Sequence, residues 1–267
     1  DKMMAKGIVP FGSGNSGWRP ANEWQVSIAL NSIAGPDNVQ KALTGEIPWT
    51  SQPFVEAINE LDSWWDKGYF GPDYFSLNGE QVMANLAEGT AAMSPTGSWN
   101  FGLVPEYFKD RQDEVGFVGF PSGKGVPYPI FSLGIGSTFS ISAAAQNPEG
   151  AANVIDQVFS EKFYTDINNV WQGEWNMPLR DLSGVSLNED VIPLYTESMA
   201  ALASAVNENQ YGYTTWTFMP PATNSYVVSG IEEVWLDSLS TEDFLAEMDK
   251  IFQQELSEGK VADIPAR

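Results

Sequence analysis

The stretch EGTAAMSPTGSW, residues 88–99, contains the succession of helix, strand and loop on which the fold assignment rests. A short helical pattern leads into it and ends at Gly89, because glycine readily takes the left-handed conformation that closes a helix. Residues 90–94 form a short apolar run that predicts a buried strand, and the Pro-Thr-Gly sequence at 95–97 predicts the turn that ends it. Trp99 follows this turn directly, at the kind of position where ligands collect in α/β folds.

Helical and extended patterns alternate along the rest of the chain, which indicates an α/β protein. Apolar residues recur at helical spacing over residues 51–65 and again over 241–256, and both stripes are typical of helices that face a core. Further helices are predicted at 20–33, which Gly35-Pro36 ends, and at 80–87, 151–163, 192–206 and 222–235. Extended segments are predicted at 8–11, 90–94, 115–121 and 131–143. We expect 90–94 and 115–120 to share one sheet, which 131–142 leaves.

The composition of the 267-residue chain disfavours several classes of function. A net charge of −22 with only 13 lysines and arginines does not suit nucleic acids or anionic membranes, because both require clustered positive charge. The chain has no histidine and no cysteine, so it lacks the commonest general base, the commonest transition-metal ligand and all thiol chemistry. We therefore expect a binding protein rather than an enzyme, with no catalytic residue, metal or cofactor.

Four blocks of sequence, taken together and in order, resemble the extracellular solute-binding proteins of sugar ABC importers, the maltose-binding-protein class. The blocks are KGIVPF at 6–11 followed by a glycine-rich loop and Trp18, PFVEA at 53–57 with DKGYF at 66–70, EGTAAM at 88–93 with GSW at 97–99, and IS at 141–142 with NPE at 147–149. The resemblance covers residues 1–152 well. Beyond them the chain matches mainly in its helical layout.

The resemblance implies a two-lobed, type II periplasmic-binding-protein-like α/β fold that closes on its solute. On this interpretation residues 1–121 and 180–267 belong to the carboxy-terminal lobe, and residues 122–179 belong to the amino-terminal lobe. Family members begin with a strand-and-helix stretch that would precede Asp1, so we expect the rest of the amino-terminal lobe upstream. The lobes are expected to close as a hinge that bends at 121–129 and near Pro178.

Candidate ligand-binding residues are those that suit a sugar, whose apolar ring face packs on aromatic side chains while its hydroxyls bind polar groups. Trp99, with Asn100 beside it, coincides with the stacking tryptophan of the family's Gly-Ser-Trp motif. Trp18 and Arg19 lie between a polar loop and a helix start, where they either face the ligand or pack as an ordinary surface loop.

Three weaker candidates follow from the same resemblance. Gly134 lies where the family brings glycine-rich backbone near its ligand, although a strand crowded by its neighbours would also need glycine there. Trp216 and Tyr226 lie in or beside a loop predicted at 207–221, where the family often adds a stacking residue. We expect the tryptophans in or beside helical stripes to belong to the core: Trp49, Trp64, Trp65, Trp171, Trp175 and Trp235.

Two other interpretations stay open. A carbohydrate hydrolase would need two carboxylates at a suitable separation, and Glu232 with Glu233 is one such pair. Alternatively, the same fold could bind a peptide or a polyamine. The G-x-G-x-x-G pattern at 12–17 suits a dinucleotide poorly, because the helix is expected to begin at Pro20, after the last of these glycines.

The sequence therefore predicts an extracellular solute-binding protein that captures a carbohydrate or oligosaccharide and delivers it to the membrane permease of an ABC transporter. It is expected to act as a monomer, either as a lipoprotein at the cell surface or in the periplasm.

Overall fold

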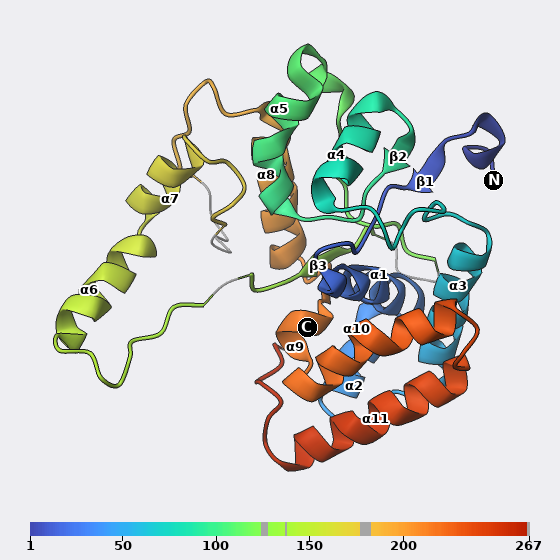
Figure 1. The fold of residues 1–267 in the computed structure, drawn as a ribbon. Helices are drawn as coiled ribbons and strands as arrows, with labels where there is room; N and C mark the ends of the chain where they lie inside the picture. The colour runs from blue at the N-terminus through green and yellow to red at the C-terminus, as the bar shows by residue number, and fades with distance from the viewer. Residues whose placement is uncertain (124–127, 137, 177–182, 266–267) are drawn as a thin grey trace. The chain divides into compact units, whose positions relative to one another are not determined.

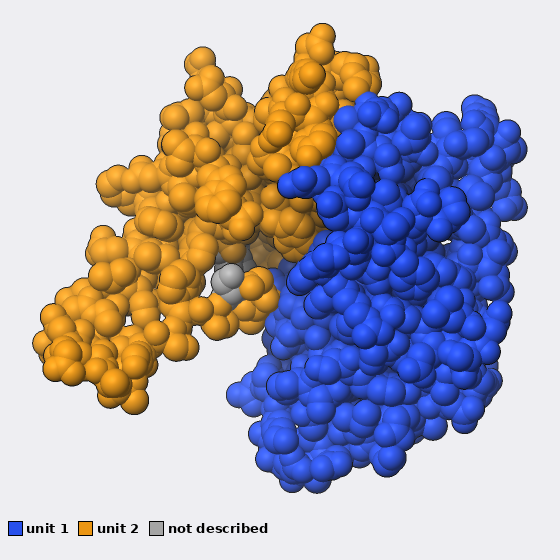
Figure 2. All heavy atoms as spheres, viewed as in Figure 1, with its two compact units in different colours: residues 1–95, 119–134, 210–267 blue, residues 96–118, 135–209 orange. Residues whose placement is uncertain are grey.

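A computed structural model of the chain describes residues 1–123, 128–136, 138–176 and 183–265. The chain forms two compact units, each assembled from segments that are distant in sequence (Figures 1 and 2). Unit 1 comprises Asp1–Pro95, Gly119–Gly134 and Gln210–Arg267, and unit 2 comprises Thr96–Val118 and Ile135–Asn209.

The chain changes from one unit to the other at 95/96, 118/119, 134/135 and 209/210. The lobe assignment made from the sequence changes at 121/122 and 179/180, and it stays a prediction because it concerns the lobes of a longer protein. The bend expected near Pro178 lies outside the described residues, as do residues 124–127 of the bend expected at 121–129.

Unit 1 is mainly helical. α1 (Asn22–Ala29) continues into the π-helical turn η3 (Leu30–Ala34), and α3 (Gln52–Asp66) packs against both. α10 (Pro221–Trp235) and α11 (Thr241–Ser257) lie side by side, and both contact α3 (Figure 1). Further helices are η1 (Met4–Lys6), η2 (Arg19–Ala21), α2 (Pro36–Leu43), α4 (Gly79–Glu88) and α9 (Thr215–Phe218). The helices predicted at 20–33, 51–65, 80–87, 222–235 and 241–256 are confirmed.

Aromatic side chains fill the core of unit 1. Trp65 of α3 stacks on Trp235 of α10, with ring centroids 4.9 Å apart and planes inclined by 7°. Trp49 is fully buried against Phe54 and Phe252, at centroid distances of 4.8 and 5.7 Å. Because burial of a large apolar side chain contributes about 2 to 3 kcal/mol, these rings join the helices firmly. The expected core positions of Trp49, Trp65 and Trp235 are confirmed.

Two short parallel pairings supply the β-structure of unit 1. β1 (Val9–Phe11) pairs with β2 (Ala91–Met93), with Val9 opposite Ala91 and Phe11 opposite Met93. β3 (Phe131–Leu133) pairs with β4 (Tyr211–Tyr213) in a separate sheet. The extended segments predicted at 8–11 and 90–94 are thus confirmed as β1 and β2.

The other two predicted strands are wrong in extent. In 115–121 only Phe120 pairs, in an isolated antiparallel bridge with Ile130, because Gly116, Gly119 and Pro121 interrupt any longer ladder. This segment therefore does not share a sheet with β2. In 131–143 the strand β3 ends at residue 133, and the described residues between 134 and 143 form no strand.

A side chain of η3 completes the edge of β4. The amide Nδ2 of Asn31 donates to the carbonyl oxygen of Tyr213 at 2.8 Å, and its Oδ1 accepts from the backbone N–H of Tyr213 at 2.9 Å. Residue 212 has to be glycine, because a Cβ there would lie 2.4 Å from Asn31 Oδ1. The π-helical turn places Asn31 at this edge, so β4 is fixed to the helix that follows α1.

Unit 2 has a smaller core. The hydroxyls of Tyr164 and Tyr195 are 2.9 Å apart, and the ring of Phe101 lies 5.6 Å from that of Tyr195. The helix predicted at 151–163 forms as two helices, because Ser160 accepts from the N–H of Phe163 and begins a new one. The elements of unit 2 are η4 (Ser98–Leu103), α5 (Val104–Phe108), η5 (Lys109–Glu114), α6 (Pro148–Val158), α7 (Glu161–Asn168) and α8 (Pro193–Asn207), the last confirming the helix predicted at 192–206.

Candidate functional site

The loop at residues 12–17 runs from β1 towards η2, and its glycines are explained by close packing. A Cβ on Gly12 would lie 2.8 Å from the Cβ of Ala91, and one on Gly14 would lie 2.3 Å from the carbonyl oxygen of Leu77. Gly17 has a φ of 77°, in the left-handed region. α1 begins only after all three glycines. The pattern therefore lets this loop approach its neighbours and lacks the geometry of a dinucleotide motif.

The exposed Trp18 at the end of this loop pairs with the half-buried Trp24 of α1. Trp18 is 52% exposed, and its ring centroid lies 5.2 Å from that of Trp24, with the planes inclined by 54°. Trp18 was predicted from the sequence, whereas Trp24 was not. A signal was available, because Trp24 lies off the stripe of α1 that buries Val26 and Ala29.

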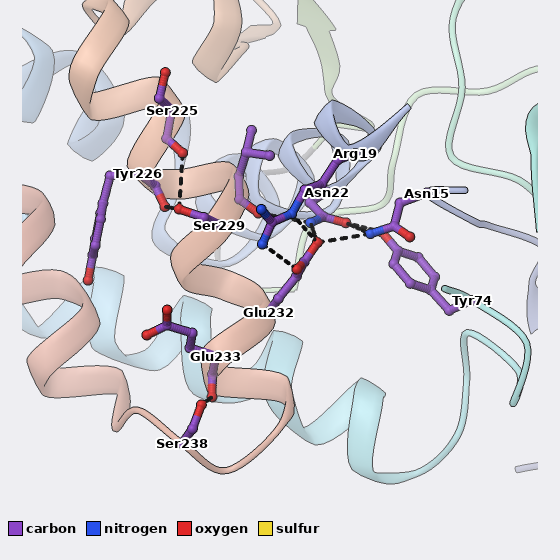
Figure 3. A network of polar contacts seen from close by, with 11 residues as sticks. Asn15, Arg19, Asn22, Tyr74, Ser225, Tyr226, Ser229, Glu232, Glu233 and Ser238 are labelled. Atoms are coloured by element: carbon purple, nitrogen blue, oxygen red, sulfur yellow. Dashed lines mark hydrogen bonds and ion pairs between the residues drawn. The ribbon is translucent and has the colours of Figure 1, made fainter. Parts of the chain in front are cut away.

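Arg19 is held by a carboxylate of α10, as Figure 3 shows. Its Nε donates to Glu232 Oε1 at 2.9 Å and its Nη2 donates to Oε2 at 2.5 Å, a bidentate ion pair. Asn15 and Asn22 also donate to Glu232 Oε1, at 3.0 and 2.6 Å. Burial alone would raise the pKa of Glu232, but the hydrogen bonds from Arg19 and Asn22 bring that pKa below its ordinary value.

The same hydrogen-bond network joins the loop at residues 12–17 to Tyr74 and to α10. Asn22 Oδ1 accepts from the hydroxyl of Tyr74 at 2.8 Å and from Asn15 Nδ2 at 3.1 Å. Arg19 therefore anchors the loop while its side chain remains 56% exposed, which leaves further N–H donors for a ligand. A carboxylate held charged by an ion pair makes a poor general acid, so Glu232 does not suit the acid role in the carboxylate pair of a hydrolase.

Gly134 and Trp216 lie in direct contact. A Cβ on Gly134 would lie 2.6 Å from Cζ2 of the Trp216 indole, so only glycine fits beneath the ring. Thr214 fixes the turn before Trp216, because its Oγ1 donates to the carbonyl oxygen of Leu133 at 2.8 Å. The crowding predicted as the alternative reason for a glycine at 134 is therefore caused by Trp216, another of the candidates.

Tyr226 lies apart from that pair. Its ring stacks on Phe244 of α11, with centroids 5.6 Å apart and planes inclined by 19°. Burial raises the pKa of its hydroxyl, and the carboxylates of Glu247, Glu233 and Asp243 raise it further. The ring thus helps to join α10 to α11, while part of it stays accessible.

Trp99 and Asn100 belong to η4 of unit 2. Trp99 is 37% exposed and its ring folds back over Gly97, where a Cβ would lie 2.2 Å from Cζ3. Asn100 Nδ2 donates to Thr96 Oγ1 at 2.7 Å, which stabilises the turn. Trp171, expected in the core, is 55% exposed, so that expectation is wrong. It follows α7 in a turn and lies beside Gly102 instead of on a buried helix face.

The structure therefore gathers the candidates into three small groups. Trp18 and Arg19 lie with Trp24, Gly134 lies with Trp216, and Trp99 lies next to Asn100. The first two groups and Tyr226 belong to unit 1, and the third belongs to unit 2. Among the described residues, no cluster of three or more acidic side chains could hold a metal ion, and no helix is long and apolar enough to cross a membrane.

Comparison with known proteins assigns the family. Residues 1–165 match the family described as bacterial extracellular solute-binding protein, and this match covers more than half of the 267 residues. The chain belongs to that family. The resemblance found in the four sequence blocks is thereby confirmed.

Individual relatives are more distant, and the chain spans less than two thirds of each. An uncharacterized ABC transporter extracellular-binding protein of Pyrococcus horikoshii is 27% identical over 153 residues, which are 57% of this chain and 32% of that protein. The glucose-binding protein GlcS of Saccharolobus solfataricus is 31% identical over 94 residues, 34% of this chain and 16% of its own length. A solved chitin oligosaccharide binding protein has a TM-score of 0.76 at 20% identity, over 97% of this chain and 63% of that one. This likeness confirms the two-lobed, type II periplasmic-binding-protein-like α/β fold.

Proposed function

We propose that the protein containing this chain binds a carbohydrate or oligosaccharide outside the cell and presents it to the permease of an ABC transporter. The observation that carries the proposal is the exposed Trp18, paired with Trp24, at the end of a loop anchored by the Arg19–Glu232 ion pair. The exposed indole of Trp18, held against Trp24, offers a flat apolar face that can pack against the ring of a sugar. A loop fixed in advance loses little further freedom when the ligand arrives.

The sugar class is supported by two relatives. GlcS is named for glucose and the solved structure is named for chitin oligosaccharide, and both ligands carry the ring faces and hydroxyl groups that aromatic and polar side chains recognise. Trp99 with Asn100 supplies a second aromatic and amide set on unit 2, and Trp216 over Gly134 supplies a third on unit 1. We propose that the whole protein uses these sets together when its lobes close on the ligand.

The remaining parts of the proposal concern the intact protein in its cellular setting. It acts as a monomeric receptor in the periplasm or at the cell surface, without a cofactor, and its partner is the membrane permease. Its family consists of extracellular solute-binding proteins, which favours binding over catalysis. The alternatives, a carboxylate-pair hydrolase and a receptor for a peptide or polyamine, are outcomes that the following experiment distinguishes.

Isothermal titration calorimetry of the full-length protein against glucose, chitin oligosaccharides, a polyamine and a short peptide tests the proposal. We expect saturable binding of at least one sugar and loss of most of that affinity in Trp18→Ala/Trp24→Ala. Trp171→Ala is the matched control, because Trp171 is an exposed tryptophan outside the three groups. Binding of only the polyamine or the peptide would replace the sugar proposal. In a separate turnover assay with an aryl glycoside, release of product would replace it with the hydrolase.

X-ray scattering of the same protein tests closure of the lobes. The radius of gyration is expected to decrease when the identified sugar is added. An unchanged radius at saturating sugar would refute closure while leaving the binding result intact.

A further inference from the structure

A pocket on unit 1 that includes none of the candidate sugar-binding residues lies between α3, η3 and residues 120–123. Its volume is about 290 Å³. Glu56, Glu60 and Trp64 line it from one face of α3, where they recur every four residues, and Phe120 and Gly123 line it from the other side. The pocket thus combines an aromatic wall with two carboxylates.

Two phenylalanine rings hold the aromatic wall of the pocket in place. Trp64 is half-buried, and its ring centroid lies 5.9 Å from that of Phe120 and 5.8 Å from that of Phe11. These neighbours hold the indole in place beside the pocket. An indole face attracts a cation through its negative π surface, and tryptophan does so best of the aromatic residues.

The carboxylate of Glu60 is placed next to this wall by the indole itself. Trp64 Nε1 donates to Glu60 Oε1 at 2.8 Å. One carboxylate oxygen is therefore tied to the ring edge, and the second oxygen of the same group remains beside it. A positively charged group bound there would meet a carboxylate and an indole face together.

Among the described residues that line the pocket, Glu60 offers a carboxylate acceptor, whereas each donor is already used. Ser32 Oγ donates to the carbonyl oxygen of Ile28 at 2.7 Å, the N–H of Gly123 donates to the carbonyl oxygen of Ser32 at 2.8 Å, and that of Phe120 donates to Ile130 at 2.8 Å. Trp64 Nε1 is engaged by Glu60. A sugar hydroxyl both donates and accepts, but an ammonium group only donates. This lining therefore matches an ammonium group better than a sugar.

We propose that this pocket binds the ammonium group of a small primary alkylamine. The ammonium lies between the Glu60 carboxylate and the Trp64 indole face, and the alkyl chain lies along Phe120 and Pro121. The net charge of −22 assists by raising the local concentration of cations. The site uses none of the residues assigned to the sugar, so it stands or falls independently of the proposed function.

The test is a titration of the ¹⁵N-labelled full-length protein with n-butylammonium chloride, followed through the indole N–H signals. The Trp64 signal is identified as the one missing from Trp64→Phe. n-Butanol is the matched neutral probe, and sodium chloride keeps the ionic strength constant. We expect a saturable shift of the Trp64 signal with n-butylammonium and none with n-butanol, because the alkyl chains are alike and only the charge differs.

Two variants assign the effect to the carboxylate. Glu60→Gln keeps the shape of the side chain and is expected to weaken n-butylammonium binding about fivefold, the loss of about 1 kcal/mol that an exposed charged contact contributes. Glu88→Gln on α4 removes an equally exposed carboxylate outside the pocket and is expected to leave the affinity unchanged. Equal responses to n-butanol and n-butylammonium, a non-saturable shift, or equal losses in both variants would each overturn the proposal.

Discussion

Units 1 and 2 bury their apolar side chains to very different degrees. In unit 1, α3, α10 and α11 each carry residues that are completely buried, and one aromatic cluster joins them. In unit 2, α6 has no buried residue, and Val154, Phe159 and Val170 are 62%, 50% and 82% exposed. Yet the sequence of α6 is as amphipathic as that of a core helix. An apolar stripe thus predicts that one face of a helix can pack against another element, but it does not predict that such an element is present in the same unit.

The largest difference is expected in the loss of unfolding free energy between a core truncation in unit 1 and a surface truncation in unit 2. Leu61→Ala on α3 removes a fully buried side chain and should lower the free energy of unfolding by about 2 to 5 kcal/mol. Val154→Ala on α6 removes a side chain that is 62% exposed and should change it by less than about 0.5 kcal/mol. Urea unfolding measures both. Comparable losses would show that α6 is packed in solution.

The next effect concerns ligand binding by unit 2. Trp99→Ala should weaken sugar binding by the full-length protein by about thirtyfold or more, because truncation of a desolvated aromatic anchor costs about 2 kcal/mol or more. Its thermal midpoint should change little, since Trp99 is 37% exposed and its ring lies over Gly97 of its own turn. Calorimetry with the identified sugar measures the first quantity and a thermal scan the second. The proposed role of Trp99 is falsified if sugar affinity is normal or if the midpoint collapses.

Two carboxylates of unit 1, each 4% exposed, should respond to pH in opposite ways. Glu255 accepts from the N–H groups of Ala222 and Thr223 at 3.1 and 2.9 Å and so caps α10. Burial opposes its charge, but these hydrogen bonds bring its pKa below the ordinary value. For Glu23 burial dominates and raises the pKa, despite a hydrogen bond from Asn224.

The signs follow from linkage between protonation and folding. Ionised Glu255 stabilises the folded protein. This stabilisation is fully present above the pKa of the residue in the unfolded chain, about 4.3, and is lost as the pH falls through its lower pKa in the folded protein. Glu23 favours the folded protein when its carboxyl group is protonated, and this stabilisation is lost as the pH rises through its raised pKa in the folded protein. At pH 7, Glu255→Gln should therefore destabilise the protein by about 1 to 2 kcal/mol, whereas Glu23→Gln should stabilise it. Unfolding curves at pH 4 and pH 7 measure both; the same sign for the two variants at pH 7 would contradict the assignment.

The smallest effects are expected from a matched pair of helix caps. Ser240 accepts from the N–H of Asp243 at the start of α11, and Asn147 accepts from that of Gly150 at the start of α6. Ser240→Ala should cost about 1 kcal/mol of global stability, because α11 is part of the core of unit 1. Asn147→Ala should leave global unfolding unchanged and speed hydrogen exchange in α6 alone. Global destabilisation by Asn147→Ala would show that the two units unfold together.

The sequence predicted the long helices well because their periodic stripes extend over several turns. α11 was predicted from the last apolar stripe in the sequence, and α3 from an apolar stripe that begins after Pro53. Strands were predicted less well, since β1 to β4 are each three residues long, too short for an alternating pattern to establish itself. α2 was missed because Pro36 was interpreted only as the end of a helix, although proline also suits the first turn of the next one.

The candidate residues were easier to name than their arrangement. Trp18, Trp99 and Trp216 stand out in sequence because they follow loops or turns. The partner of Arg19 could not be predicted, because Glu232 lies 213 residues further along the chain and many other acids were available. The role of Asn31 was not predicted. Its hydrogen bonds to the backbone of Tyr213 depend on the π-helical turn at 30–34, and no local sequence pattern predicts that turn.

The polar network around Glu232 also sets the order in which this chain can fold during its synthesis. Asn22 and Glu232 are separated by 210 residues, and all of unit 2 is encoded between them. At about 5 to 20 residues per second, the ribosome needs about 10 to 40 s to deliver α10 after α1 has emerged. During that interval the buried faces of α1 and α3 have no α10 or α11 to cover them. Unit 1 therefore completes its core only after all of unit 2, and then α10 and α11, have been synthesised, and until then the faces of α1 and α3 that these helices cover stay accessible to chaperones.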